Sequence, residues 1–284
     1  MTRHLLHIGY PKTATNFLRA WFDAHPQIAF KRGGFAGFAR LPDIAAPAAL
    51  SAEPPRLRVS SSELLATPHA EVMRAVRYTR PGEAFAADQA RVCATLAGLF
   101  PNAEVLIVTR GFRSMILSSY SQYVRTGGTQ SLADFAASGR ANGAWHYDRL
   151  VSAYAGAFGR DRLILLPWEL LRDRPADFVA HLEGRFGLDP GPLPKQRPNQ
   201  ALAPAEIQAQ LRLNRALARA PRPVAALYAR AAAAGRLPLR ALARFGKGEA
   251  DALDPAVLEA YRGQAAVLAA EALFRPYAAD YLFD

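Results

Sequence analysis

Short apolar runs alternate with segments of helical periodicity over residues 3 to 186 of this chain. A continuous apolar run bounded by turn residues is typical of a buried strand, and such runs predict strands within residues 3–9, 27–30, 56–65, 103–110 and 161–169. Apolar residues spaced three and four apart predict helices at 15–25, 69–79, 83–99, 114–125, 131–138 and 147–158. This alternation indicates an α/β fold, in which a parallel sheet is flanked by crossover helices.

The pattern changes in the last third of the chain. Residues 190–204, "PGPLPKQRPNQALAP", predict a loop. Residues 204–274 are rich in alanine and arginine at helical spacing and contain no convincing strand. We therefore expect an α/β core over residues 1–190 and a helical extension packed on it over residues 191–284, together forming one domain.

Composition narrows the class of protein without assigning a function. The chain has 35 Lys and Arg against 24 Asp and Glu, a net charge of +11, which favours anionic partners. Excess arginine and alanine are also typical of GC-rich genomes, so charge alone does not decide the function. Cys93 is the only cysteine, which excludes an intrachain disulfide and a cysteine-based zinc site. No apolar run reaches the ~18 residues of a membrane span, so we expect a soluble, cytoplasmic protein.

The first strand runs into a polar turn that is suited to an anion. In "HLLHIGYPKTATNFLRAW" (4–21), the residues Lys12, Thr13, Thr15 and Asn16 stand where the strand ends and a helix begins. Backbone N–H groups in the first turn of a helix have no partner within the helix, and they readily bind phosphate or sulfate.

This turn differs from the common ATP-binding loop. That loop reads G-x-x-x-x-G-K-[ST] and places a hydroxyl on Mg²⁺. Here Lys12 comes only three residues after Gly9, and the second glycine is missing.

The strand "AEVLIVTR" is a second difference from ATP-binding proteins, because it ends in Arg110. Phosphoryl transfer from ATP commonly uses an acidic residue near this position to help hold a metal ion. An arginine there repels Mg²⁺ and attracts a second phosphate. The sequence therefore predicts a nucleotide with phosphates at two places and no metal between them.

Two linked segments resemble sulfotransferases that use 3′-phosphoadenosine 5′-phosphosulfate (PAPS). "PKTATNFL" is similar to their 5′-phosphosulfate loop, and "RGFRSMILSSYSQYVRTGG" is similar to their 3′-phosphate segment, where a serine follows an arginine by eight residues, as Ser118 follows Arg110. Segments "LILLPWELL" and "RPNQAL" resemble the same bacterial and carbohydrate sulfotransferases. The resemblance covers about residues 4–215 and implies a P-loop-type α/β fold, PAPS as sulfuryl donor and no metal.

The resemblance also implies roles for individual residues. Lys12 neutralises charge on the bridging oxygen as the 5′-phosphate leaves, and Arg110 and Ser118 hold the 3′-phosphate. The 5′-phosphate is held by backbone and side-chain groups around the start of the helix, at Thr13, Ala14, Thr15 and Asn16. A later loop, with Arg197 and Asn199, closes over the nucleotide. The family usually has glycine in place of Ala14, and alanine is acceptable there if its φ is negative.

The acceptor needs a base to take its proton. The leading candidate is Glu63 in "RVSSSELL", expected at the carboxyl edge of the sheet, with His7, His69 and His146 as alternatives. Ser60 and Glu63 also form an S-x-x-E pattern, which is typical of a helix capping box and requires no catalysis.

The sequence thus predicts a PAPS-dependent sulfotransferase acting on a hydroxyl or amine of a glycan, lipid or small molecule, with no nucleic acid as partner. Its arginine-rich extension could contact anionic lipid or glycan peripherally, although a solvated helical face explains the same pattern. Two other classes stay open: a P-loop nucleotide kinase, and a basic protein that binds nucleic acid or membranes without catalysis.

Overall fold

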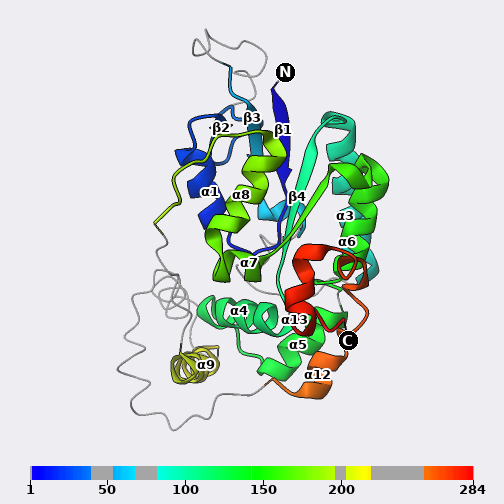
Figure 1. Cartoon of the computed structure of the whole chain (residues 1–284). Helices are drawn as coiled ribbons and strands as arrows, with labels where there is room; N and C mark the ends of the chain where they lie inside the picture. The colour runs from blue at the N-terminus through cyan, green and yellow to red at the C-terminus, as the bar shows by residue number, and fades with distance from the viewer. Residues whose placement is uncertain are drawn as a thin grey trace.

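The computed structural model describes residues 2–39, 54–67, 82–141, 143–195, 203–218 and 253–283. Its centre is a five-stranded sheet in which neighbouring strands are parallel, in the order β2-β3-β1-β4-β5 (Figure 1). The strands are β1 (Arg3–His7), β2 (Ile28–Phe30), β3 (Leu57–Ser61), β4 (Glu104–Thr109) and β5 (Leu163–Pro167). This confirms the expected α/β class.

The order of the strands places β1 at the centre of the sheet. Leu5 of β1 is in register with Val59 of β3 on one side and with Glu104 of β4 on the other. All six residues of β4 are buried, which matches its continuous apolar sequence. Because the strands are parallel, the residues that follow β1, β3 and β4 all emerge at one edge of the sheet.

Helices cover both faces of the sheet. In Figure 1, α1 and α8 lie to one side of the strands and α3 and α6 to the other, while α4, α5 and α9 gather beyond the carboxyl ends of the strands. Their bounds are α1 (Thr15–Ala24), α3 (Gly82–Leu99), α4 (Phe112–Arg125), α5 (Leu132–Ala141), α6 (Tyr147–Phe158), α7 (Trp168–Asp173), α8 (Pro175–Phe186) and α9 (Pro204–Leu217).

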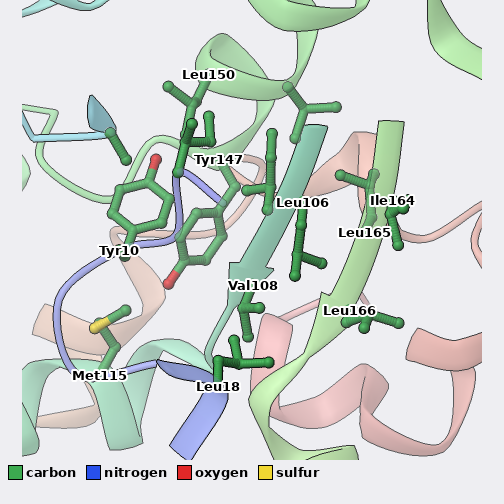
Figure 2. Packing of buried hydrophobic residues seen from close by; sticks show 14 of the residues in the cluster. Tyr10, Leu18, Leu106, Val108, Met115, Tyr147, Leu150, Ile164, Leu165 and Leu166 are labelled. Carbon is green, nitrogen blue, oxygen red and sulfur yellow. The ribbon is translucent and has the colours of Figure 1, made fainter. Parts of the chain in front are cut away.

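The core is continuous from the sheet into the loop after β1. Figure 2 shows the rings of Tyr10 and Tyr147 next to each other near Leu106 and Val108 of β4. The two rings meet edge to face with centroids 5.2 Å apart, and both residues are fully buried. The turn after β1 is therefore packed on the hydrophobic core.

The last part of the chain is less regular than its sequence predicted. Residues 253–283 form short elements: α12 (Pro255–Glu259), the 3₁₀ turns η4 (Ala266–Leu268) and η5 (Ala272–Tyr277), and α13 (Ala278–Tyr281). Pro276 lies inside η5 and lacks the N–H that a longer α-helix requires. Between residues 204 and 274, α9 is the one extended helix that the described ranges contain.

The C-terminal segment, residues 253–283, is attached to the core by specific contacts. The Asp148 carboxylate accepts hydrogen bonds from the N–H groups of Ala266 (3.1 Å) and Val267 (2.9 Å). The Tyr261 hydroxyl donates to the Ala136 carbonyl at 2.6 Å. Figure 1 shows α13 beside the carboxyl ends of the strands, close to the start of α4.

One predicted strand ends earlier in the structure than in the sequence pattern, and one predicted helix is not described. The run 161–169 predicted a strand, but β5 ends at Pro167, and Trp168 and Glu169 belong to the first turn of α7. The helix predicted at 69–79 lies outside the described residues. In the described parts of the chain, no helix combines the length and the apolar character that crossing a membrane requires.

Candidate functional site

The loop between β1 and α1 has an unusual backbone. Lys12 (φ +70°) and Ala14 (φ +66°) both adopt the left-handed conformation. The sequence analysis accepted alanine at position 14 on condition of a negative φ, and the structure contradicts that condition. A left-handed conformation costs a non-glycine residue roughly 1–2 kcal/mol, because its Cβ crowds the following carbonyl oxygen. The loop therefore keeps its shape against an intrinsic preference at two positions.

Contacts beneath the loop explain how it keeps this shape. A Cβ on Gly9 would lie 2.9 Å from His7 Nε2 and 3.3 Å from Thr13 Oγ1, so the backbone passes too close for any side chain. The buried Thr13 hydroxyl donates to the Tyr10 carbonyl. In this conformation the Thr13 hydroxyl proton is used within the loop, which leaves the backbone N–H as the donor that Thr13 can offer to an anion.

The N-terminus of α1 has no internal cap. Ala14 occupies the N-cap position without a side-chain hydrogen bond, and the first turn contains no acidic residue. The Thr15 hydroxyl is buried and has no hydrogen-bond partner, while Asn16 is exposed. Uncapped N–H groups, the positive end of the helix dipole and an unpaired hydroxyl together form a site suited to a phosphate or sulfate group.

The half-buried Lys12 lies among other cations. Burial lowers the pKa of Lys12, and the positive charges of Arg125 and Arg110 lower it further, while the Glu63 carboxylate acts in the opposite sense. These three positive charges outnumber the nearby carboxylates of Glu63, which acts on Lys12, and Glu169, which acts on Arg110, and this favours a multiply charged anion at this edge of the sheet.

Arg110 connects the second loop to the first. Its Nη1 donates to the Lys12 carbonyl at 3.0 Å, and its Nε donates to Ser114 Oγ at 2.8 Å. The guanidinium carbon lies 3.7 Å from the centre of the Trp168 ring. The two segments that the sequence analysis assigned to the two phosphates are therefore in direct contact.

Ser118 and Ser114 are one turn apart on α4, so their side chains share a face of the helix. Ser118, assigned to the 3′-phosphate, is half-buried. Ser114 was missed by the sequence analysis, although its position four residues after Arg110 was a usable signal.

A buried carboxylate supports the Arg110 loop from below. Glu169 is fully buried, and its Oε1 accepts a hydrogen bond from the Gly111 N–H at 3.0 Å. Its Oε2 accepts from the Tyr281 hydroxyl at 3.0 Å. Burial raises the pKa of Glu169, and these hydrogen bonds oppose that change. Tyr281, near the end of the chain, carried no sequence signal.

Glu63 lies close to the lysine loop. It begins the 3₁₀ turn η1 (Glu63–Leu65) directly after β3, is half-buried, and interacts electrostatically with Lys12 and Arg19. The capping-box interpretation of Ser60 is wrong. Ser62 is the N-cap and accepts from the Leu64 N–H, whereas Ser60 belongs to β3 and accepts from the Ala36 N–H at 2.7 Å.

The alternative bases are less suitably placed. His7 is fully buried, its Nδ1 lies 2.8 Å from Ser61 Oγ, and burial with the nearby Arg19 charge lowers its pKa to about 3. His146 is the N-cap of α6, where it accepts from the Arg149 N–H at 3.4 Å. His69 lies outside the described residues, as do Arg197 and Asn199.

Metal-ligating side chains do not cluster here. In residues 2–39, 54–67, 82–141, 143–195, 203–218 and 253–283, no three His, Cys, Asp or Glu side chains are grouped so that they could hold a metal ion.

The parallel sheet has a central strand, β1, that leads through a polar loop into α1, which is the arrangement of a P-loop-type α/β fold. The chain matches the family model described as "Sulfotransferase family" over residues 5–191, and it therefore belongs to the sulfotransferase family. A sulfotransferase from Alicyclobacillus acidocaldarius has a similar solved structure, with 16% sequence identity and a TM-score of 0.47, covering 76% of this chain and 94% of that chain. Among curated proteins, none matches this chain.

Proposed function

We propose that this sulfotransferase transfers the sulfuryl group of PAPS to a hydroxyl or amine of an acceptor and releases adenosine 3′,5′-bisphosphate. The acceptor is a glycan, a lipid head group or a small molecule. The observation that supports the proposal most strongly is the 3.0 Å hydrogen bond from Arg110 Nη1 to the Lys12 carbonyl. It brings the side chains expected to bind the two phosphates of one nucleotide to the same edge of the sheet.

The groups around the start of α1 fit a 5′-phosphosulfate. The unpaired, buried Thr15 hydroxyl and the uncapped N–H groups of the first turn are donors without partners inside the protein. A bound anion would satisfy them. Asn16, exposed in the same turn, is available to an incoming ligand.

The chemistry follows from these groups. The acceptor oxygen or nitrogen forms a bond to sulfur while the bond from sulfur to the bridging oxygen breaks, and the electron pair of that bond goes to the 5′-phosphate. Lys12 stabilises the charge that develops on this leaving oxygen. A sulfuryl group carries less charge than a phosphoryl group, so a cationic side chain can meet this requirement.

Glu63 is the proposed general base. Of the three candidates among the described residues, it is the one that is both half-exposed and electrostatically coupled to Lys12. The acceptor proton passes to its carboxylate as the new bond forms. His7 is sealed in the core, and His146 uses its Nδ1 lone pair as a helix cap.

A thermal-shift comparison tests the donor assignment. Adenosine 3′,5′-bisphosphate, AMP and ATP are added separately to the purified full chain, without metal. The expected result is selective stabilisation by the bisphosphate, because only this nucleotide offers phosphates to both loops. Equal shifts with AMP would contradict the 3′-phosphate site. Stabilisation by ATP that requires Mg²⁺ would favour a nucleotide kinase, and tight salt-dependent binding to polyanions alone would favour a non-enzymatic binding protein.

A further inference from the structure

The C-terminal segment reaches the Arg110 loop through a chain of buried hydrogen bonds. The Tyr281 hydroxyl donates to Glu169 Oε2 at 3.0 Å and lies 3.1 Å from the Thr109 hydroxyl. Because a phenol has a single proton and gives it to Glu169, Thr109 is the donor of the second bond. The Tyr281 side chain is fully buried, so these contacts are shielded from bulk solvent.

Glu169 connects Tyr281 to Gly111 and Ser114, which follow Arg110 in the chain. Its other oxygen, Oε1, accepts from the Gly111 N–H at 3.0 Å and lies 3.5 Å from Ser114 Oγ. Ser114 Oγ in turn accepts the hydrogen bond from Arg110 Nε at 2.8 Å. Each oxygen of the carboxylate is therefore held by a different part of the chain.

Direct packing reinforces the hydrogen bonds. A Cβ on Gly111 would lie 2.5 Å from the Cβ of Asp280 and 2.9 Å from its carbonyl oxygen. The residue that follows Arg110 is therefore in close contact with the residue that precedes Tyr281. The same segment is attached elsewhere to Asp148 and Ala136, so it stays in place when one hydroxyl is removed.

We propose that Tyr281 and Glu169 are positioning residues, through which the C-terminal segment holds Arg110 and Ser114 in the geometry that recognises the 3′-phosphate. This inference rests on the proposed function. Tyr281 does not touch the nucleotide. It sets the affinity for a 3′-phosphorylated nucleotide, and thereby selectivity over AMP, more than it sets turnover.

The Tyr281→Phe variant tests the proposal, with Tyr261→Phe as its matched control. Tyr261 is also fully buried in the C-terminal segment, but its hydroxyl donates to the Ala136 carbonyl, away from Glu169. Dissociation constants for adenosine 3′,5′-bisphosphate and AMP are measured by titration calorimetry. Tyr281→Phe is expected to weaken bisphosphate binding about 10-fold, which is within the range for residues that act on a site without touching its ligand, and to leave AMP binding within about 2-fold. Tyr261→Phe is expected to change neither constant.

The readouts separate positioning from a merely structural role. General destabilisation would lower the unfolding temperature but leave the dissociation constants of the folded protein intact. In the transfer assay, the KM for PAPS should rise while kcat changes by less than about 2-fold. A bisphosphate constant for Tyr281→Phe equal to that of the wild type would overturn the proposal.

If Tyr281→Phe does not fold, two other experiments test the proposal: the Glu169→Gln variant, and amide hydrogen exchange on the wild-type protein. Glu169→Gln keeps an acceptor for the Gly111 N–H and removes the charge, and it should lose the same selectivity. In the wild-type protein, bisphosphate but not AMP should slow amide exchange in the peptide spanning residues 278–283, because coupling between two sites is reciprocal. Equal exchange with both nucleotides, in a wild type that binds the bisphosphate selectively, would overturn the proposal. A wild type without that selectivity would instead contradict the proposed function itself.

Discussion

The side chain of Arg110 is hydrogen-bonded to the backbone of Lys12: its guanidinium donates to the Lys12 carbonyl at 3.0 Å. The two residues are 98 positions apart in sequence, and they come together because β1 and β4 are adjacent parallel strands that end at the same edge of the sheet. The contact joins the backbone of the lysine loop to the guanidinium of Arg110, so the two loops are held together before any ligand binds.

Arg110→Lys should show how much nucleotide binding depends on the shape of the guanidinium and how much on its positive charge. Lysine keeps the positive charge but cannot reach the Lys12 carbonyl, Ser114 Oγ and a phosphate with a planar fork. We expect affinity for adenosine 3′,5′-bisphosphate to fall at least about 10-fold, measured by titration calorimetry. Arg113→Lys, at an exposed position in the first turn of α4, is the control and should leave affinity unchanged. Unchanged binding in Arg110→Lys would mean that the fork plays no part in recognition.

Lys12→Ala should reduce turnover far more than donor binding. Removing a group that stabilises charge on a leaving oxygen typically lowers kcat by about 10²–10³-fold. The backbone strain at φ +70° is similar for lysine and alanine, so the fold should persist. Lys31→Ala, at an exposed position, serves as the control in the same assay. A Lys12→Ala enzyme that retains a tenth or more of its turnover would refute the role in leaving-group stabilisation.

Ala14→Gly should stabilise the protein despite the usual penalty for glycine. The left-handed conformation at φ +66° costs alanine roughly 1–2 kcal/mol, and glycine adopts it freely at an entropic cost of about 0.5–1 kcal/mol. The free energy of unfolding in urea should therefore rise by up to about 1 kcal/mol.

The matched control for this substitution is on the same helix. Ala20 is an exposed residue within α1, where glycine should lower the free energy of unfolding by about 1 kcal/mol. Opposite signs for the two alanine-to-glycine substitutions confirm strain at position 14. Equal losses would mean that the loop is not strained there.

Much of the core could be predicted from local sequence patterns, whereas its supporting contacts could not. The apolar run ending at Thr109 specified a buried strand, so Arg110 was expected at the carboxyl edge of the sheet. The positive φ of Ala14 was not predictable, because alanine normally avoids it and only contacts such as that between the Thr13 hydroxyl and Tyr10 maintain it. Tyr281 is 172 positions from its partner Thr109 in β4, and no periodic pattern records a pairing over that separation.

Acid should destabilise the protein through histidines that the folded state keeps uncharged. The folded state holds His7 neutral, with its pKa lowered to about 3, while the unfolded chain takes up a proton near pH 6.5. The unfolded state therefore binds more protons between pH 3 and pH 6.5, and stability rises with pH across this window. Between pH 6.5 and pH 4.5, His7 alone should remove about 2 kcal/mol from the free energy of unfolding.

Substitution isolates this contribution from that of the carboxylates. His7→Gln should flatten the dependence of the urea midpoint on pH over this range, whatever its effect on stability at pH 7. His4, whose pKa is lowered to about 4 by burial and by Arg58, should act with the same sign over a narrower window, so His4→Gln should flatten the dependence less. Identical slopes for both variants and the wild type would contradict the neutral state of these two histidines in the folded protein.

Glu63→Gln should test the proton acceptor directly. Glutamine is nearly isosteric but cannot accept the acceptor's proton, so kcat should fall by about 10²–10⁴-fold while PAPS binding changes little. Glu259→Gln, which removes an exposed carboxylate paired with Arg262 on the C-terminal segment, is the control. Near-normal turnover in Glu63→Gln would assign the proton to a histidine instead; the fully buried position of His7 and the capping role of His146 make this outcome unexpected.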